Sequence, residues 1–146
     1  MEAVEFDFVV KDSLQALELY EKIFPVQRVE VTDFKTGANE AVFNIFGTRF
    51  HMLDENPEYY LVAPVKGHPQ SFWFNVMVND IEKTYQSAME NGCTEIQGIT
   101  RMEEFGISNA QFLDPFGYVW MLCILQDFST QHCSDKLHNF APERFF

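Results

Sequence analysis

Apolar side chains alternate with other residues along positions 4–10, and this period of two predicts a β-strand. Apolar side chains then recur at helical spacing, which predicts a helix over residues 13–24. Asp12 or Ser13 can cap its first turn, and Pro25 lies just beyond its end. The chain therefore opens with a strand followed by a helix. The alternating apolar residues of the strand are Val4, Phe6, Phe8 and Val10.

The same order of elements begins again about seventy residues later. Alternation along residues 71–78 predicts a second opening strand. Asp80 can cap a second helix over residues 80–91, and Asn91-Gly92 supplies the left-handed conformation that commonly ends a helix. The alternating apolar residues of this strand are Phe72, Phe74, Val76 and Val78.

Both halves also close in the same way, with two strand-like segments joined by a turn that contains glycine. One further β-like segment follows each helix, so each half is predicted to be β-α-β-β-β. The closing segments and their turns are 40–46, Gly47 and 48–53 in the first half, and 108–113, Asp114-Pro115-Phe116-Gly117 and 118–125 in the second.

The length suits a single domain of two modules, at about residues 1–63 and 70–125. Residues 64–69 contain Gly-His-Pro and little apolar content, which is typical of a linker. Residues 126–146 form a tail that is polar at first and ends in two phenylalanines. Two interpretations of this tail stay open, because it can cover a pocket or a partner subunit, or it can fray.

Composition favours a folded, soluble protein and disfavours two classes of partner. The chain is 47% hydrophobic and contains 16 phenylalanines, so a core is easily built. Its formal net charge is −12, and its Lys and Arg residues are scattered, which argues against nucleic acid and against an anionic membrane surface. No apolar run approaches the roughly 20 residues needed to span a bilayer. The N-terminus is acidic, unlike a secretory signal peptide.

The three cysteines indicate reduced thiols rather than a disulfide framework, because their number is odd and their spacings are unrelated. We therefore expect a cytoplasmic protein. Cys123 lies in an apolar run and is interpreted first as a small buried side chain. His132, Cys133 and His138 match no standard zinc-ligand spacing and lack a fourth partner, so no zinc site is predicted there.

The doubled β-α-β-β-β order and the Asp-Pro-Phe-Gly turn before the last apolar strand resemble the vicinal oxygen chelate superfamily, which includes glyoxalases, bleomycin resistance proteins and extradiol dioxygenases. The resemblance covers about residues 3–125. Residues 40–50, the strand from Ser71 and the turn look most similar to the PhnB-like, "3-demethylubiquinone methyltransferase-like" subgroup. That name does not describe an activity here, because no glycine-rich nucleotide loop follows a strand.

The resemblance implies an α+β fold in which the two modules form a cupped, mixed and mainly antiparallel sheet around a cavity, with the helices outside. It also implies four places for metal ligands, on the first and last strand of each module. Counting back from Asp12 and Asp80 assigns Glu5 and Trp73 to two of these places. Aligning the turn glycines, Gly47 and Gly117, assigns the other two to His51 and Met121.

These four residues do not make a complete metal site. Indole is not a metal ligand, and a thioether prefers soft Cu(I), so only Glu5 and His51 suit a hard or borderline divalent ion. We therefore expect no metal and no other cofactor. Glyoxalase and extradiol dioxygenase activities, which the resemblance would otherwise suggest, are disfavoured.

Strand alternation separates a helix-facing set of residues from a cavity-facing set. The cavity set mixes polar and apolar groups, as small-molecule pockets do, and indicates a small, partly aromatic or amphipathic ligand. Glu5 and His51 are the candidate catalytic pair, because a carboxylate-oriented imidazole can act as a general base. Other interpretations stay open. Trp73 and Met77 can simply pack in the core, and His51 can be a structural histidine. Glu5 and Asp7 can be solvated side chains at the wet edge of the cup. The other predicted cavity residues are Asp7, Leu53, Trp73, Asn75, Met77, Met121 and Cys123.

Two functions from different classes are consistent with this pattern. The first is a protein that binds a small molecule in its cavity without a complete metal site, as in the bleomycin-resistance branch. The second is a lyase, isomerase or hydrolase that uses Glu5 and His51 with or without a divalent metal. A third possibility is a domain in which side chains have filled the cavity and which serves only in protein assembly. We also expect a homodimer, because members of this superfamily often pair and exposed Phe patches seldom stay uncovered.

Overall fold

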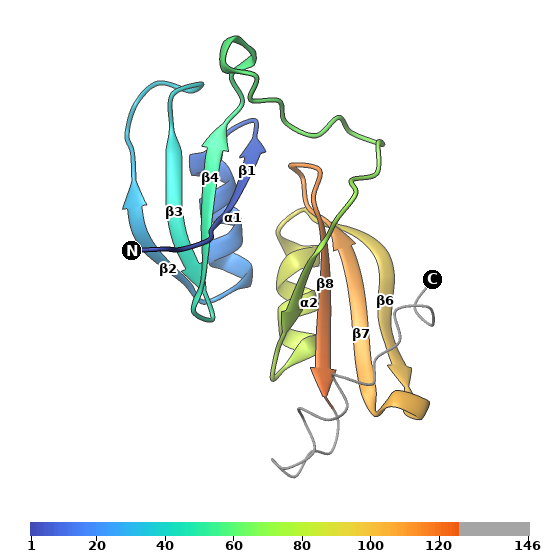
Figure 1. Cartoon of the computed structure of the whole chain (residues 1–146). Coiled ribbons are helices and arrows are strands. Elements are labelled where there is room, and N and C mark those ends of the chain that lie inside the picture. The colour runs from blue at the N-terminus through green and yellow to red at the C-terminus, as the bar shows by residue number, and fades with distance from the viewer. Residues whose placement is uncertain (126–146) are drawn as a thin grey trace.

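The computed structural model describes residues 1–125 as two modules, each with the order β-α-β-β-β (Figure 1). The predicted α+β fold is therefore confirmed. The tail 126–146, with the terminal phenylalanines and the group His132, Cys133 and His138, lies outside the described residues. The elements are β1 (Phe6–Val10), α1 (Ser13–Ile23), β2 (Val26–Val31), β3 (Glu40–Ile45) and β4 (Thr48–Asp54), then β5 (Phe74–Met77), α2 (Ile81–Glu90), β6 (Thr94–Met102), β7 (Ile107–Leu113) and β8 (Val119–Leu125), with short 3-10 helices at Pro57–Tyr59 and Glu103–Phe105.

Each module forms an open four-stranded sheet with the same strand order. The orders are β1-β4-β3-β2 and β5-β8-β7-β6. The opening strand runs parallel to the last strand of its module, and the other neighbours are antiparallel, so both sheets are mixed and mainly antiparallel. The module's helix covers one face of its sheet (Figure 1). We call the opposite face of each sheet its open face.

The two helices start and end where the pattern predicts. The Asp12 side chain accepts a hydrogen bond from the Gln15 backbone N–H at 3.0 Å, and Asp80 accepts one from the Lys83 N–H at 3.0 Å. Asp12 is therefore the cap of α1, and Ser13 instead donates to Asp54. Gly92 has a φ of 92°, which is the left-handed conformation expected after α2.

The opening strands are shorter than the alternation predicts. β1 begins at Phe6 instead of Val4, and β5 covers only Phe74–Met77. Each lies at the edge of its own sheet and hydrogen-bonds only to the last strand of its module. The apolar alternation continues beyond the residues that pair with the neighbouring strand. A strand ends where its hydrogen bonds to that neighbour end, so β1 and β5 are shorter than the alternating segments.

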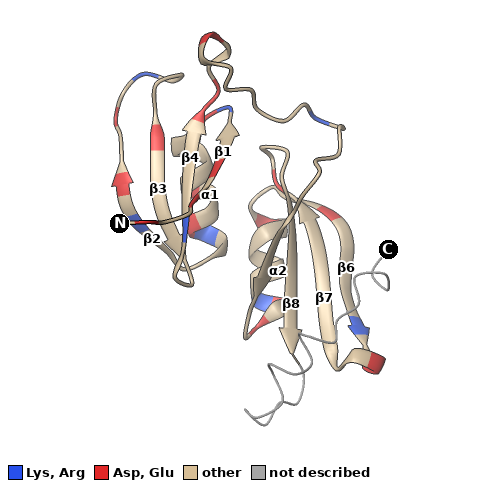
Figure 2. Ribbon diagram, viewed as in Figure 1, with Lys and Arg blue, Asp and Glu red and all other residues tan. Residues whose placement is uncertain are grey.

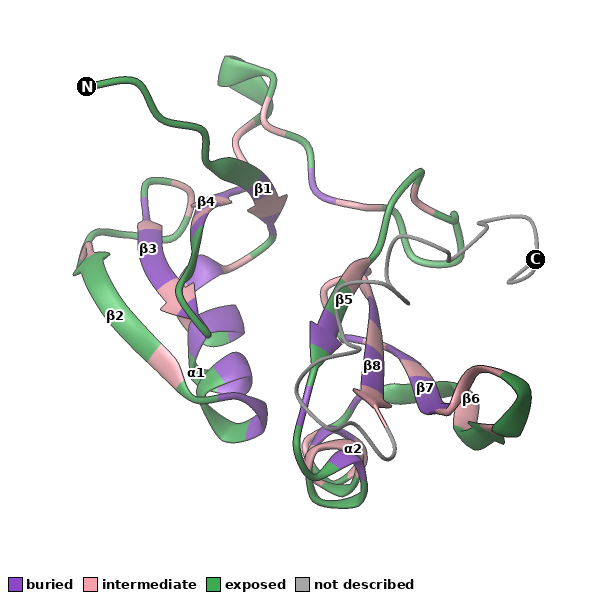
Figure 3. Ribbon diagram, turned by 60° about the horizontal axis from the view of Figure 1, so that its bottom comes forward, coloured by how far each residue is buried: buried purple, intermediate pink, exposed green. Residues whose placement is uncertain are grey.

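The helix-facing residues of both sheets form one aromatic core between the modules. Phe8 of β1 contacts Phe74 of β5 and Tyr118, with ring centroids 5.3 and 5.2 Å apart. Trp120 is fully buried and lies 4.5 Å from Phe74 and 5.1 Å from Tyr20 of α1, measured between ring centroids. Figure 3 shows the buried residues on the parts of α1 and the strands that face this core. Burial of such rings is a large apolar contribution to stability.

Hydrogen bonds from buried groups also join the modules. The Tyr20 hydroxyl of α1 donates to Asp114 at 2.6 Å, and the Trp120 indole N–H donates to the same carboxylate at 2.9 Å. The backbone N–H groups of Phe116 and Tyr118 also donate to Asp114. Burial raises the pKa of Asp114 above its ordinary value, although these hydrogen bonds oppose the rise. The Asp-Pro-Phe-Gly turn therefore connects β7 to β8 and also holds the two modules together through hydrogen bonds to Asp114.

The predicted linker crosses from the first module to the second beside this turn (Figure 1). Ala63, just before it, is buried and donates its backbone N–H to the Glu55 carboxylate at 2.8 Å. A Cβ on Gly117, whose φ is 97°, would lie 2.8 Å from the Pro64 Cβ. Glycine is thus required at position 117 both for its backbone conformation and for this close approach. No helix within residues 1–125 is long and apolar enough to cross a membrane.

Candidate functional site

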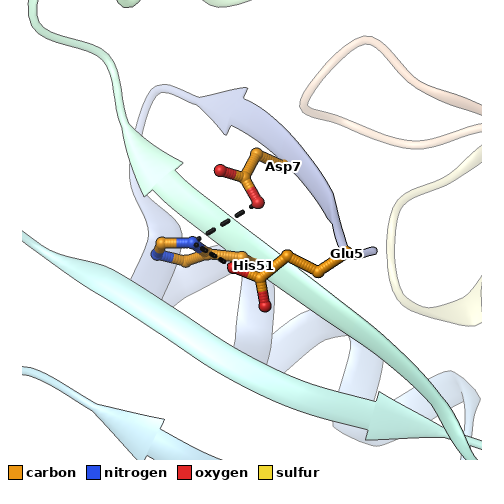
Figure 4. Close-up of side chains that lie close together, drawn as sticks. All are labelled: Glu5, Asp7 and His51. Atoms are coloured by element: carbon orange, nitrogen blue, oxygen red, sulfur yellow. Dashed lines mark ion pairs between the residues drawn. The ribbon is translucent and has the colours of Figure 1, made fainter. Parts of the chain in front are cut away.

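His51 lies among carboxylates on the open face of the first sheet (Figure 4). Asp7 of β1 and His51 of β4 are register partners on neighbouring parallel strands, so their side chains share a face. The His51 Nδ1 lies 3.4 Å from Asp7 Oδ1 and 3.5 Å from Glu5 Oε1. On the other side of the ring, Nε2 lies 3.2 Å from Glu40 Oε2. The structure therefore brings Glu5, Asp7 and His51 together, and Glu40 completes the carboxylate cluster.

Arg49 supplies the positive charge at this cluster. Its guanidinium donates to Glu5 Oε2 at 2.7 Å, and this hydrogen bond lowers the pKa of Glu5 below its ordinary value. Both side chains are substantially exposed, so the ion pair contributes little to stability. Its main effect is to orient the Glu5 carboxylate beside the imidazole.

This cluster can support two kinds of chemistry. Donor atoms of Glu5, Asp7 and His51 all lie within 4.8 Å of one another, which is close enough for a shared cation. Alternatively, an imidazole held between carboxylates can accept a proton from a bound molecule as a general base. His51 is partly buried, with 18% of its side chain exposed, so it stays within reach of a ligand.

The corresponding positions of the second module carry neither acid nor base. Asn75 of β5 and Met121 of β8 are register partners at the places that Asp7 and His51 occupy in the first module. The Asn109 amide nitrogen lies 4.0 Å from Met121 Sδ, and Gln97 donates to the Asn109 carbonyl oxygen at 2.8 Å. Amide and thioether groups therefore replace carboxylate and imidazole. Trp73 and Met121, at the two implied ligand places of the second module, offer no oxygen or nitrogen ligand to a hard divalent metal.

A cavity of about 600 Å³ lies between the opening strands of the two modules. Four residues predicted from the sequence line it, namely Asp7, Trp73, Asn75 and Met77. Residues of both modules therefore line this one cavity. The complete lining is Phe6, Asp7, Phe8, Ile45, Phe46, Thr48, Phe50, Phe72, Trp73, Phe74, Asn75, Val76 and Met77.

The remaining predicted residues are not among the residues that line this cavity. Glu5 and His51 belong to the carboxylate cluster, which meets the cavity at Asp7. Leu53 pairs with Glu40 across β3 and β4, and Met121 contacts the Asn109 amide. Cys123 is buried, and burial raises the pKa of its thiol. Convergence of all four implied ligand places on one cavity therefore stays a prediction.

Sequence reasoning did not identify Glu40, Arg49 and the phenylalanines of the cavity. Glu40 could have been found, because hairpin pairing around Gly47 places it opposite Leu53, next to His51 on the same face. Arg49 lies two residues before His51 and therefore shares its face. Phe46 gave no such signal, since it occupies the turn with a φ of 47° and follows neither strand's alternation.

The chain matches the family model of the Glyoxalase/Bleomycin resistance protein/Dioxygenase superfamily over residues 3–122. It belongs to this superfamily. The recognition of a vicinal oxygen chelate protein from the doubled strand order is thereby confirmed. No curated protein is similar enough in sequence to count as a relative.

Several solved structures share the fold of the chain. The fosfomycin resistance protein FosX from Listeria monocytogenes, complexed with Mn(II) and sulfate, is 10% identical, with a TM-score of 0.68 over 96% of this chain and 98% of that chain. The PhnB protein from Bacillus cereus is 14% identical, with a TM-score of 0.64 over 84% and 99%. TioX from Micromonospora sp. ML1 is 16% identical, with a TM-score of 0.63 over 88% and 100%. At these identities the likeness concerns the fold alone.

Proposed function

We propose that this glyoxalase-superfamily protein binds a small, partly aromatic molecule in the cavity between β1 and β5, without a complete metal site. The observation that carries the proposal is the cavity itself. Its volume of about 600 Å³ is within the usual range for small-molecule sites. Aromatic and aliphatic side chains make up most of its described lining, in which only Asp7, Thr48 and Asn75 are polar. A few polar groups on an apolar wall are what orient a ligand in such sites.

The side chains at the two implied ligand places of the second module favour a binding role over metal-dependent chemistry. Trp73 and Met121 stand at two of the four places that the superfamily pattern assigns to ligands. Neither offers an oxygen or nitrogen donor to the metal, and the neighbouring Asn75 and Asn109 are neutral amides. Trp73, which lines the cavity, thus suits contact with a ligand's apolar part.

A screen for compounds that raise the melting temperature tests this proposal, because a specific ligand stabilises the folded state by mass action. A variant that fills the cavity, Asn75→Trp, should abolish the stabilisation by every hit. Gln27→Trp is the matched control, since Gln27 is an exposed strand residue on β2 outside the cavity lining. The proposal fails if hits stabilise Asn75→Trp as much as the control.

A second candidate is an enzyme of the lyase, isomerase or hydrolase type that uses Glu5 and His51. The observation in its favour is the convergence of Glu5, Asp7 and His51, which supplies three donors on one side of a cation. The metal content of protein purified without chelators tests it. About one divalent metal per chain, lost in a His51→Ala variant, would favour the enzyme. Protein without metal would favour the binding function.

We also propose that the protein is a cytoplasmic homodimer. Large apolar side chains stay exposed on the described chain, and such patches commonly mark contacts with a partner. Sedimentation at tens of micromolar concentration should give about twice the chain mass of 17.0 kDa. A mass equal to one chain would contradict the homodimer and leave the ligand proposal untouched.

A further inference from the structure

We infer that the ligand of this cavity is an organic cation, such as an amine or guanidine attached to an apolar or aromatic group. The inference rests on the proposed function, because it specifies the ligand of that same site. It follows from the charges around the cavity and from the nature of its walls, which are independent observations.

The first observation is the charge of the lining. Asp7 is the ionisable side chain among the described lining residues, and no Lys or Arg accompanies it. About half of the Asp7 side chain is exposed, with a fraction of 54%. One of its oxygens, Oδ1, lies 3.4 Å from His51 Nδ1 (Figure 4). This carboxylate can therefore accept hydrogen bonds from a cationic group in the cavity.

The surroundings of Asp7 add negative charge instead of neutralising it. Glu5 and Glu40 lie on either side of His51, whose Nδ1 lies close to Asp7, so three carboxylates gather here. Arg49 is the guanidinium at this cluster, and it is already paired with Glu5. Figure 2 shows acidic positions on β1 and β3, whereas β5, β7 and β8 carry no charged residue. The potential at the cavity is therefore negative, and an anionic ligand would be repelled.

The second observation is the aromatic wall. Phe46, Phe72 and Trp73 line the cavity and keep 62%, 45% and 41% of their surface exposed. The face of an aromatic ring carries partial negative charge and attracts cations, most strongly for indole. A wall of rings beside a carboxylate therefore binds an ammonium group and its hydrocarbon part together. A neutral ligand would contact the aromatic rings but gain no ionic attraction to the carboxylate.

Three probes of equal length separate these contributions: 3-phenylpropylammonium, 3-phenylpropanol and 3-phenylpropanoate. Their affinities are measured by calorimetry or by NMR titration at low salt. We expect the ammonium probe to bind at least about tenfold more tightly than the alcohol, and the carboxylate probe to bind more weakly than the alcohol. Raising the ionic strength should lower the affinity of the ammonium probe alone, because salt screens the attraction between its charge and the carboxylates. If the alcohol or the carboxylate probe binds as tightly as the ammonium probe, or more tightly, the inference is wrong.

Replacing one carboxylate tests where the preference originates. Asp7→Asn should lower the affinity for the ammonium probe about threefold to tenfold and leave the alcohol unchanged. Glu104→Gln is the matched control, because it removes the same charge from an exposed position outside the cavity lining, and it should change neither affinity. An equal effect of both variants would contradict a specific role of Asp7.

The outcomes distinguish this inference from the proposed function on which it rests. If the alcohol binds as tightly as the ammonium probe and Asn75→Trp blocks both, the cavity binds ligands and only the charge preference is wrong. If none of the probes binds, or if Asn75→Trp leaves their binding intact, the inference and the site fail together.

Discussion

The two modules share one backbone plan but differ at corresponding positions of their open faces. The pair Asp7 and His51 in the first module corresponds to Asn75 and Met121 in the second. Likewise, Glu40 opposite Leu53 corresponds to Asn109 opposite Cys123. Acid and imidazole on one side are matched by amide and thioether on the other, on identical strand orders. The fold therefore does not determine the chemistry, and each half can contribute a different kind of contact to one ligand.

The buried aspartates of the two modules show a second difference. Asp54 accepts hydrogen bonds from Ser13, Gly37 and Asn39, all within its own module. Asp114 instead binds Tyr20 of the first module and Trp120 of the second. The first carboxylate thus organises a single module, whereas the second joins the two. We therefore expect Asp114 to help hold the two modules together.

The largest expected effect comes from removing the carboxylate that joins the modules. Asp114→Ala leaves the buried Tyr20 hydroxyl and Trp120 indole without their acceptor, so the free energy of unfolding should fall by about 3 kcal/mol. Urea unfolding measures this change. Asp33→Ala, at an exposed position, should change it by less than about 0.5 kcal/mol. A small effect of Asp114→Ala would show that Asp114 does not hold the modules together.

Supplying the missing donors in the second module should create a metal site. The double variant Trp73→His with Met121→Glu should bind Mn(II) about tenfold to a hundredfold more tightly than the original chain, because donors then face the cation from both halves. Paramagnetic resonance of free Mn(II) measures the affinity. Adding His51→Ala to the double variant should remove the gain. If no gain is seen, the four positions do not converge as the superfamily pattern implies.

The two buried aspartates should respond to pH in opposite directions. Burial alone raises the pKa of Asp54, but its hydrogen bonds from Ser13, Asn39 and Gly37 prevail and lower it. Its stabilising contribution is therefore present above the unfolded-state pKa, about 3.9, and is lost as pH falls through the lower folded-state value. Burial raises the pKa of Asp114, so its contribution is fully present below the unfolded-state value and decreases as pH rises through the folded-state value.

Unfolding measured from pH 7 downward tests this contrast. The destabilisation caused by Asp54→Asn should shrink at low pH, whereas that caused by Asp114→Asn should grow. Because only part of each effect depends on pH, these changes should be smaller than that of Asp114→Ala. Parallel pH profiles for the two variants would contradict the assignment.

The smallest expected effect concerns the stability contribution of His51. His51→Ala should change the free energy of unfolding by less than about 0.5 kcal/mol, because the side chain is partly solvated and its carboxylate partners are exposed. Thermal and urea unfolding measure it. A loss above about 2 kcal/mol would indicate a structural histidine, and the functional interpretation of the cluster would then be wrong.

The repeat of strand and helix patterns was enough to predict the fold, since both helices, their aspartate caps and the closing hairpins follow local rules. Strand alternation placed Glu5, Asp7 and His51 in the cavity-facing set, and the family pattern singled out Glu5 and His51. The phenylalanines of the cavity did not, because Phe46 lies in a turn and Phe72 lies outside the paired part of β5. Their place depends on how the two modules pack, which no local pattern encodes.

The two tryptophans permit the most direct test of the central claim that the cavity between β1 and β5 binds the ligand. Trp73 lines that cavity, whereas Trp120 is fully buried with its indole N–H bonded to Asp114, so it serves as an internal control. During titration with 3-phenylpropylammonium, the indole N–H signals of both are followed by ¹⁵N NMR. The account predicts a saturable shift of the Trp73 signal while the Trp120 signal stays in place. Saturable binding that leaves the Trp73 signal unmoved would contradict it.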